Sequence, residues 1–326
     1  MTDSFILVLA TGGTIAGQAG SATRRDYRPG QIDIADFLAE FDALGVDARL
    51  EGRQVANIDS ANIGSDIWRQ LHSACMEAMD DPACGGVVIT HGTDTAEETA
   101  FLLDQTLPTT KPVVLVGAMR PADAVGSDGL RNFANAVQVA ADAHAAGRGV
   151  LLVMGDQVLA ARDARKARTG GTDAFAGFPR GPVALANPAA IDWLAPPWRD
   201  GDPARYAFPD EFPRVPILHI FAGMDSASVR SAMADGAQGV VLAGLGSGNA
   251  PDAVLATLAE AVTNGIAVAR STRVDEGLVD REPEDDGNGF IAARALGPAK
   301  ARILLQLLIA NGVTDMVEMQ AAFNRR

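Results

Sequence analysis

Positive charge is scarce in this sequence of 326 residues, which has 27 lysines and arginines against 41 aspartates and glutamates. The net charge of −14 provides no positive field that could offset the repulsion of phosphate groups. We therefore expect no binding to nucleic acid or to an anionic membrane surface. No apolar run reaches the ~18 consecutive residues of a membrane-spanning helix.

Cysteine is scarce as well, since Cys75 and Cys84 are the only two. Two cysteines do not staple a domain of this size, and we expect both to be reduced, small apolar side chains. The first residues lead directly into an apolar run and lack the basic start, apolar centre and cleavage site of a signal peptide. This predicts a cytoplasmic protein, or a periplasmic one if a leader has been removed.

Several catalytic motifs are missing. The four histidines are scattered, and no Cys/His spacing suits a metal. There is no Gly-x-Ser-x-Gly nucleophile motif and no glycine-rich phosphate loop ending in Gly-Lys-Ser/Thr. The glycines of residues 10–17 have the wrong spacing for a dinucleotide site. We therefore expect neither a metal nor another cofactor.

Apolar residues, at 48%, can form a sizeable core, and strand patterns alternate with helix patterns along the chain. This alternation predicts right-handed βαβ units and an α/β fold. We expect a larger N-terminal, doubly wound, mainly parallel sheet domain at 1–190, a linker at 191–214 and a smaller C-terminal α/β domain at 215–326. The predicted strands are 5–10, 54–58, 87–89, 112–119, 149–154, 215–221, 239–243 and 266–269. The predicted helices are 34–44, 63–79, a helix after Thr95, 129–145, 225–233, 251–262, 298–310 and 314–323.

Polar turns follow the predicted strands, where ligands bind in open α/β sheets. The central one contains Thr93 and Asp94, and Thr95 and Glu98 after it have the spacing of a helix capping box. Residues 21–29 form a long polar loop with Tyr27, for which a lid is the sharper interpretation. Residues 159–172 concentrate positive charge as either a solvated helix face or a functional segment, and 275–289 are expected to be an acidic loop.

The side chains expected at strand ends form a hydroxyl-rich set: Thr14, Ser60 and Thr93, with Asp94 and Lys166. Threonine is a poor nucleophile until a base takes its proton. Lys166 could be that base only if its surroundings hold it in the neutral form, with Asp94 fixing its orientation. Backbone amides of the glycine turns could stabilise an oxyanion. The set predicts hydrolysis at a carbonyl, although each threonine taken singly is more simply a turn or cap residue.

Residues 10–17 (ATGGTIAG) and 89–98 (ITHGTDTAEE) resemble the two signature motifs of the bacterial-type L-asparaginases. The resemblance runs nearly end to end. It includes four supporting matches, at residues 116–121, 162–166, 244–249 and 300–305.

This resemblance implies that Thr14 attacks the side-chain amide carbon of L-asparagine, giving a β-aspartyl ester and ammonia, and that Tyr27 helps to activate it. Thr93, Asp94 and Lys166 are implied to be a second, triad-like catalytic set. Asp94 is also implied to bind the substrate α-ammonium, and Ser60 the α-carboxylate.

The resemblance further implies a homotetramer built as a dimer of intimate dimers. The neighbouring subunit's second domain then completes each site. In this arrangement Asn249 and Glu282 contact the substrate in trans. The place of Glu282 follows from its distance to Gly289 and Phe290.

Two features depart from the family. The residue after the serine is usually Gln, Glu or Asp but is Ala61 here, and Asn62 could compensate. This puts the preference for asparagine over glutamine in doubt. The family's frequent disulfide is not evident, because Cys75 and Cys84 lie too close in sequence for the usual pairing.

Two other functions stay open. An asparaginase-like subunit of a tRNA-dependent amidotransferase shares the scaffold, but the acidic composition of this chain argues against it. A non-catalytic amino-acid sensor is also possible, although the chain keeps all five catalytic residue types.

Overall fold

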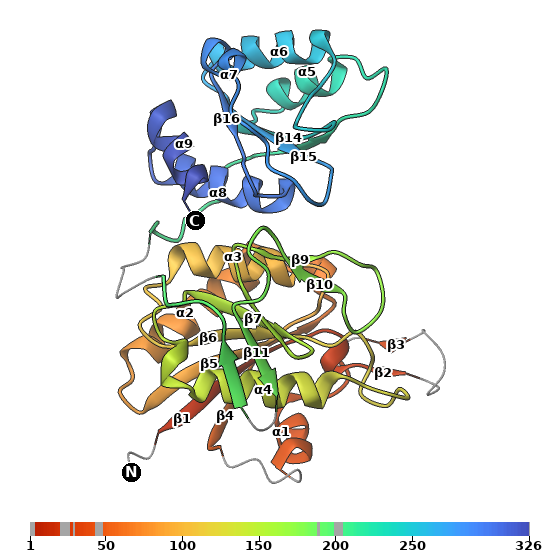
Figure 1. The fold of residues 1–326 in the computed structure, drawn as a ribbon, viewed down its shortest axis with the longest axis vertical. Helices are drawn as coiled ribbons and strands as arrows, with labels where there is room; N and C mark the ends of the chain where they lie inside the picture. Colours follow the sequence, from red (N-terminus) through yellow and green to blue (C-terminus); the bar gives the residue numbers. More distant parts are fainter. Residues whose placement is uncertain are drawn as a thin grey trace. The chain divides into compact units, whose positions relative to one another are not determined.

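The structure, a computed structural model, describes residues 4–19, 27–28, 30–42, 48–187, 190–198 and 205–325. The chain divides into two compact units, Met1–Arg205 and Tyr206–Arg326 (Figure 1). Each unit has its own sheet, and each is described by itself below.

Eight of the described strands of the N-terminal unit form one sheet in the order β12-β11-β8-β7-β6-β5-β1-β4. Strands β4, β1, β5, β6 and β7 run parallel, whereas β8, β11 and β12 continue the sheet antiparallel. The mainly parallel sheet that the sequence predicts is therefore confirmed. The strands are β1 (Phe5–Gly12), β4 (Leu50–Ile58), β5 (Cys84–Thr90), β6 (Val113–Val116), β7 (Val150–Met154), β8 (Gln157–Ala160), β11 (Ala184–Asn187) and β12 (Ala190–Trp193).

Helices cover both faces of this sheet (Figure 1). Successive side chains of a strand point to opposite faces, and β1 shows this directly: Phe5, Leu7 and Leu9 pack into one core, Ile6 and Val8 into the other. The first core also contains side chains of α2 (Ser65–Asp80) and α3 (Ala96–Thr106), the second those of α1 (Ile34–Asp42) and α4 (Gly129–Ala141). Burial on both faces explains why these strands read as continuous apolar runs.

Cys75 and Cys84 both lie in the first core as buried, free thiols. Burial, with a smaller contribution from the nearby Cys84, raises the pKa of the Cys75 thiol to about 12. The expectation of two small apolar side chains is confirmed.

The structure differs from the sequence-based expectations at three places. Residues 159–172 contain no helix: they hold the end of β8 and β9 (Ala164–Lys166), which pairs with β10 (Phe175–Gly177). The helix at 129–145 ends at Ala141, because the Asp142 carboxylate accepts a hydrogen bond from the amide of His144 and starts a separate 3-10 turn, η3 (Ala143–Ala145). Residues 190–193, partly inside the predicted linker, form the edge strand β12.

The sheet of the C-terminal unit is parallel, in the order β13-β14-β15-β16. Helices α5 and α6 pack on one face. Helix α8 packs against β14 and β15, and α9 against β16. The elements are β13 (Ile217–His219), α5 (Ala227–Ala234), β14 (Gly239–Gly244), α6 (Asp252–Thr263), β15 (Ala267–Thr272), α7 (Pro283–Asn288), β16 (Phe290–Ala292), α8 (Pro298–Ala310) and α9 (Met316–Asn324).

The segment predicted as an acidic loop at 275–289 contains the helix α7, so this prediction is wrong. Pro283 occupies the first turn of this helix, and Glu282 and Asp285 form a reciprocal capping box. The acidic side chains that suggested a loop therefore start a helix, where negative charge is favourable.

Candidate active site

Three turns leave the carboxyl ends of adjacent strands of the N-terminal sheet. Strand β1 lies between β4 and β5, and its last residues pair with theirs: Gly12 with Ile58, and Ala10 with Thr90. The chain then continues into the turns that carry Thr14, in η1 (Thr14–Ala16); Ser60, in η2 (Ser60–Asn62); and Thr93. All three hydroxyl residues predicted for the site therefore follow one edge of one sheet.

Glycine backbones allow these turns to touch. Gly13 has a φ of 78°, and a Cβ atom built on it would lie 2.5 Å from the Cα of Gly92. A Cβ on Gly92 would lie 2.6 Å from Ser60 Oγ. On the other side, a Cβ on Gly117 would lie 3.0 Å from the Cγ2 of Thr93. Such approaches are open only to a residue without a side chain, so the turns interlock through their glycines.

Side-chain hydrogen bonds tie the same turns together. The Thr11 hydroxyl donates to the carbonyl of Thr90 at 2.9 Å, which joins the ends of β1 and β5. The Thr95 hydroxyl donates to the carbonyl of Ser60 at 2.9 Å. Thr95 stands at the N-cap of α3 but makes no side-chain cap bond, so the predicted capping box is wrong. Its hydroxyl instead holds the serine turn against the second signature motif.

Lys166 enters the site from β9. Its ammonium donates to the Thr93 hydroxyl at 2.8 Å and forms an ion pair with the Asp94 carboxylate. The Lys166 side chain is 17% exposed and that of Asp94 is 60% exposed. The carboxylate is therefore shared between the lysine and solvent. Thr93, Asp94 and Lys166, predicted as a set, are brought together, and Thr14 and Ser60 lie on the turns that contact theirs.

His91 is a buried residue of this site that the sequence analysis does not predict. Its Nδ1 lies 2.7 Å from the carbonyl of Gly92, so that nitrogen carries the proton. Burial lowers the pKa of His91 to about 4, against the smaller upward effect of the Gly92 hydrogen bond, and the ring is neutral at pH 7. Nε2 has no hydrogen-bond partner within the described residues. Its position inside a turn rich in threonine and glycine is the sequence feature that could have identified His91 as a residue of the site.

Tyr27 begins the short strand β3 (Tyr27–Arg28), which pairs with β2 (Gln18–Ala19) through Ala19. Because β2 follows η1 directly, this pairing brings the backbone of Tyr27 back toward the turn that carries Thr14. Residues 20–26 and 29, most of the predicted lid, lie outside the described residues, as does the Tyr27 side chain.

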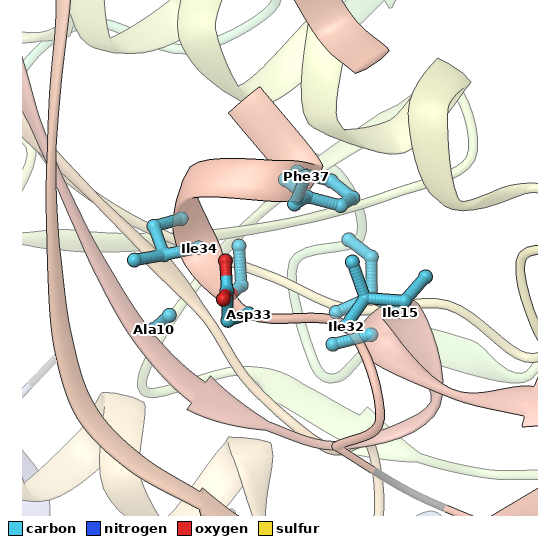
Figure 2. Close-up of a pocket in the computed structure, with 8 residues that line it drawn as sticks. Ala10, Ile15, Ile32, Asp33, Ile34 and Phe37 are labelled. Carbon is cyan, nitrogen blue, oxygen red and sulfur yellow. The ribbon is translucent and has the colours of Figure 1, made fainter. Parts of the chain in front are cut away.

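A small cavity is lined in part by Ile15 and Ala16 of η1 (Figure 2). Figure 2 shows the Asp33 carboxylate beside mainly apolar side chains. One oxygen of that carboxylate accepts the amide of Asp36 at the start of α1. The cavity leaves about 10 Å³ for the centre of a water molecule and contains none of the candidate catalytic side chains. It is lined by Ala10, Ile15, Ala16, Ile32, Asp33, Ile34, Phe37 and Thr90. It is therefore packing space beneath the site.

Asn249 and Glu282 belong to the other unit. Asn249 is exposed and closes a tight loop, in which its amide and carbonyl both bond to Leu245. Glu282 is the N-cap of α7. Each therefore has a fixed backbone within the C-terminal unit.

Two other kinds of site are absent from the described residues. No three His, Cys, Asp or Glu side chains among them are grouped as metal ligands. None of the described helices is long and apolar enough to cross a bilayer.

The fold and these turns agree with two family models. Residues 5–199 match the model "Asparaginase, N-terminal" and residues 214–323 match "Glutaminase/Asparaginase C-terminal domain". The chain belongs to the asparaginase family.

Particular relatives extend along the whole chain. L-asparaginase 2 of Escherichia coli is 39% identical over 325 residues, which cover 98% of this chain and 92% of that protein. The probable periplasmic L-asparaginase of Haemophilus influenzae is 38% identical over 93% of this chain and 88% of its own length. The crystal structure of a probable cytoplasmic L-asparaginase from Campylobacter jejuni matches with a TM-score of 0.93 and 34% identity, over 99% of this chain and 100% of that one.

Proposed function

We propose that this protein hydrolyses L-asparagine to L-aspartate and ammonia. The observation that carries the proposal is the network in which Lys166 of β9 contacts Thr93 and Asp94, whose turn interlocks with the turn of Thr14. Membership of the asparaginase family supports the same reaction.

In the proposed mechanism, the Thr14 hydroxyl attacks the side-chain amide carbon of the substrate. Its proton passes to the leaving nitrogen, the C–N bond breaks, and ammonia departs from a β-aspartyl ester of Thr14. Water then attacks the ester, which releases aspartate and restores the hydroxyl. Thr93 and Lys166, joined by a 2.8 Å hydrogen bond, are proposed to carry the proton of the attacking hydroxyl or water toward the leaving group. Tyr27 is proposed to assist Thr14.

The same turns suit a small zwitterion. The Asp94 carboxylate is 60% exposed, which leaves an oxygen for the substrate α-ammonium. Ser60 is proposed to donate to the α-carboxylate. Ala61, after it, is exposed and offers no polar group to the substrate's amino end. Hydrolysis of L-glutamine as a second activity therefore belongs to the proposal, and the C-terminal family model carries both names.

We also propose that the protein acts as a homotetramer of intimate dimers, with Asn249 and Glu282 reaching the neighbour's site. A cytoplasmic location is proposed. The Campylobacter jejuni structure carries that description, whereas the Haemophilus influenzae relative is described as periplasmic.

Ammonia release from L-asparagine and L-glutamine tests the reaction. Thr14→Ala, Thr93→Val and Lys166→Met should each lower kcat by ~10²-fold or more, because each removes a group from covalent or proton-transfer chemistry. Lys111→Met is a matched control. Lys111 donates to the carbonyl of Ala78 at 2.8 Å and precedes β6, at the opposite edge of the same sheet.

Some outcomes would overturn the proposal. Intact turnover in Thr14→Ala would exclude the nucleophile. Tight binding of L-aspartate without any turnover by the unmodified protein would indicate the amino-acid sensor. Retention of tRNA at low salt, with ammonia release only in its presence, would indicate the amidotransferase subunit.

A further inference from the structure

Two loops of the C-terminal unit converge on one buried side chain. Arg270 lies on β15, and its side chain is 5% exposed. One loop leads to Asn249 and the other to Glu282, the two residues proposed to reach a neighbour's substrate.

Arg270 contacts the Glu282 segment through a carboxylate. Its Nε and Nη2 donate to the two oxygens of Asp285 at 2.5 and 2.6 Å, and the Asp285 side chain is 2% exposed. The same Asp285 carboxylate accepts the backbone amide of Glu282 at 2.8 Å. Nη2 also donates to the carbonyl of Asp280 at 3.1 Å and lies 4.0 Å from the Glu282 carboxylate.

The other end of the guanidinium contacts the Asn249 loop. Nη1 donates to the carbonyls of Ser247 and Gly248 at 3.3 and 3.4 Å, directly before Asn249. Gly248 has a φ of 87°, and a Cβ on it would lie 3.3 Å from Nη1 and 3.1 Å from Cγ1 of Val279. The absence of a side chain there allows the loop to lie on the guanidinium.

A planar fork of N–H donors is needed to hold one carboxylate and three backbone carbonyls at once. Arginine presents five donors in a fixed geometry, whereas lysine offers a single compact ammonium. An ion pair that only stabilised the fold would need no more than the bidentate contact between Arg270 and Asp285. Arg270 in addition uses Nη1 and Nη2 on the two backbone segments that carry Asn249 and Glu282.

We propose that Arg270 is a positioning residue that sets the spacing of Asn249 and Glu282, so that both meet one substrate. Arg270 touches no substrate itself. The inference rests on the proposed function, because it assigns Arg270 a role at that site.

Kinetics with L-asparagine test the role. Arg270→Lys keeps the charge and loses the fork, and should raise KM about tenfold while kcat changes about threefold or less, because the groups that contact the substrate shift while Thr14 does not. In a Glu282→Gln background the same change should raise KM by less than about threefold, since residues acting as one unit are not additive. An unchanged KM in a folded Arg270→Lys protein overturns the proposal. So does a result in which the effects of Arg270→Lys and Glu282→Gln on KM simply multiply.

Amide hydrogen exchange gives a readout that needs no turnover. Arg270→Lys should increase deuterium uptake in residues 245–249 and 279–285 together. Arg148→Lys is the control: Arg148 is equally buried, donates to the carbonyls of His144 and Ala195, and belongs to the N-terminal unit, whereas both loops belong to the C-terminal unit. Unchanged uptake in either loop overturns the proposal even if the protein releases no ammonia. An inactive unmodified protein with increased uptake in both loops would instead overturn only the proposed function.

Discussion

In the N-terminal unit, the turns that carry Thr14, Ser60 and Thr93 meet through glycine backbones. In the C-terminal unit, the loops of Asn249 and Glu282 are joined through the charged side chain of Arg270. The contacts between the N-terminal turns depend on the absence of side chains. The contacts between the C-terminal loops depend on one side chain with several hydrogen-bond donors. The N-terminal turns can therefore be disturbed by adding a single methyl group, and the C-terminal loops by removing a hydrogen-bond donor.

Gly13→Ala should have the largest effect on activity. The new Cβ would lie 2.5 Å from the backbone of Gly92, at a φ of 78° that side chains rarely adopt. Backbone strain and overpacking should lower the free energy of unfolding by about 2–5 kcal/mol, and kcat should fall ~10²-fold because Thr14 is displaced. Urea denaturation and ammonia release measure the two effects. Gly64→Ala, with no atom near its Cβ, should change neither. Full activity in Gly13→Ala would show that the turns do not interlock.

Asp285→Ala tests the buried ion pair between Arg270 and Asp285. It leaves the Arg270 guanidinium buried without its carboxylate, which should cost about 3–5 kcal/mol in the free energy of unfolding. Glu77→Gln removes an exposed ion pair, whose side chains are 49% and 64% exposed, and should cost ~1 kcal/mol or less. Urea denaturation measures both losses. If Asp285→Ala and Glu77→Gln lowered the free energy of unfolding equally, burial would not be what makes the ion pair of Arg270 important.

The buried ring of His91 makes the N-terminal turns sensitive to acid. In the unfolded chain its pKa is near 6.5, and in the folded protein burial lowers the pKa to about 4. Protons therefore favour the unfolded state in this window. The free energy of unfolding is therefore not reduced by His91 above pH 6.5. It decreases by about 3 kcal/mol as the pH falls from 6.5 toward 4.

His91→Gln should remove this part of the pH dependence. His144→Gln, whose histidine side chain is 80% exposed, should keep it. The measurement is the free energy of unfolding in urea at several pH values between 7.5 and 4. Parallel curves for His91→Gln and the unmodified protein would contradict the prediction.

Thr95→Val should give the smallest effect. It removes the 2.9 Å hydrogen bond to the Ser60 carbonyl and should lower the free energy of unfolding by ~1 kcal/mol. KM should rise because Ser60 is held less firmly. Thr263→Val removes a comparable bond within α6, to the carbonyl of Ala259, and should leave KM unchanged. If Thr95→Val and Thr263→Val have the same KM, Thr95 does not contribute to substrate binding.

Patterns that depend on neighbouring residues were predictable from the sequence. The buried strands read as apolar runs, and the predicted bounds of α8 agree with the structure at both ends. The turns of Thr14, Ser60 and Thr93 were predictable too, because each follows a strand that ends at the same edge of the sheet.

Patterns that depend on distant partners were not predictable. The hydroxyl of Thr95 bonds to a residue 35 positions earlier instead of capping its own helix. Helix α7 has six residues and receives a buried arginine from β15, which no local pattern reveals. The strand that carries Lys166 is short and charged, and it exists because Phe175–Gly177 pair with it.

The central place of β1 has a consequence for synthesis of the chain. Ile6 pairs with Leu50 on one side and with Gly86 on the other. The strand emerges from the ribosome roughly 80 residues before β5, a wait of several seconds at ~5–20 residues per second. During that interval the apolar run at the start of β1, Phe5 to Ala10, is exposed, so the nascent chain should be a good client for chaperones that bind early.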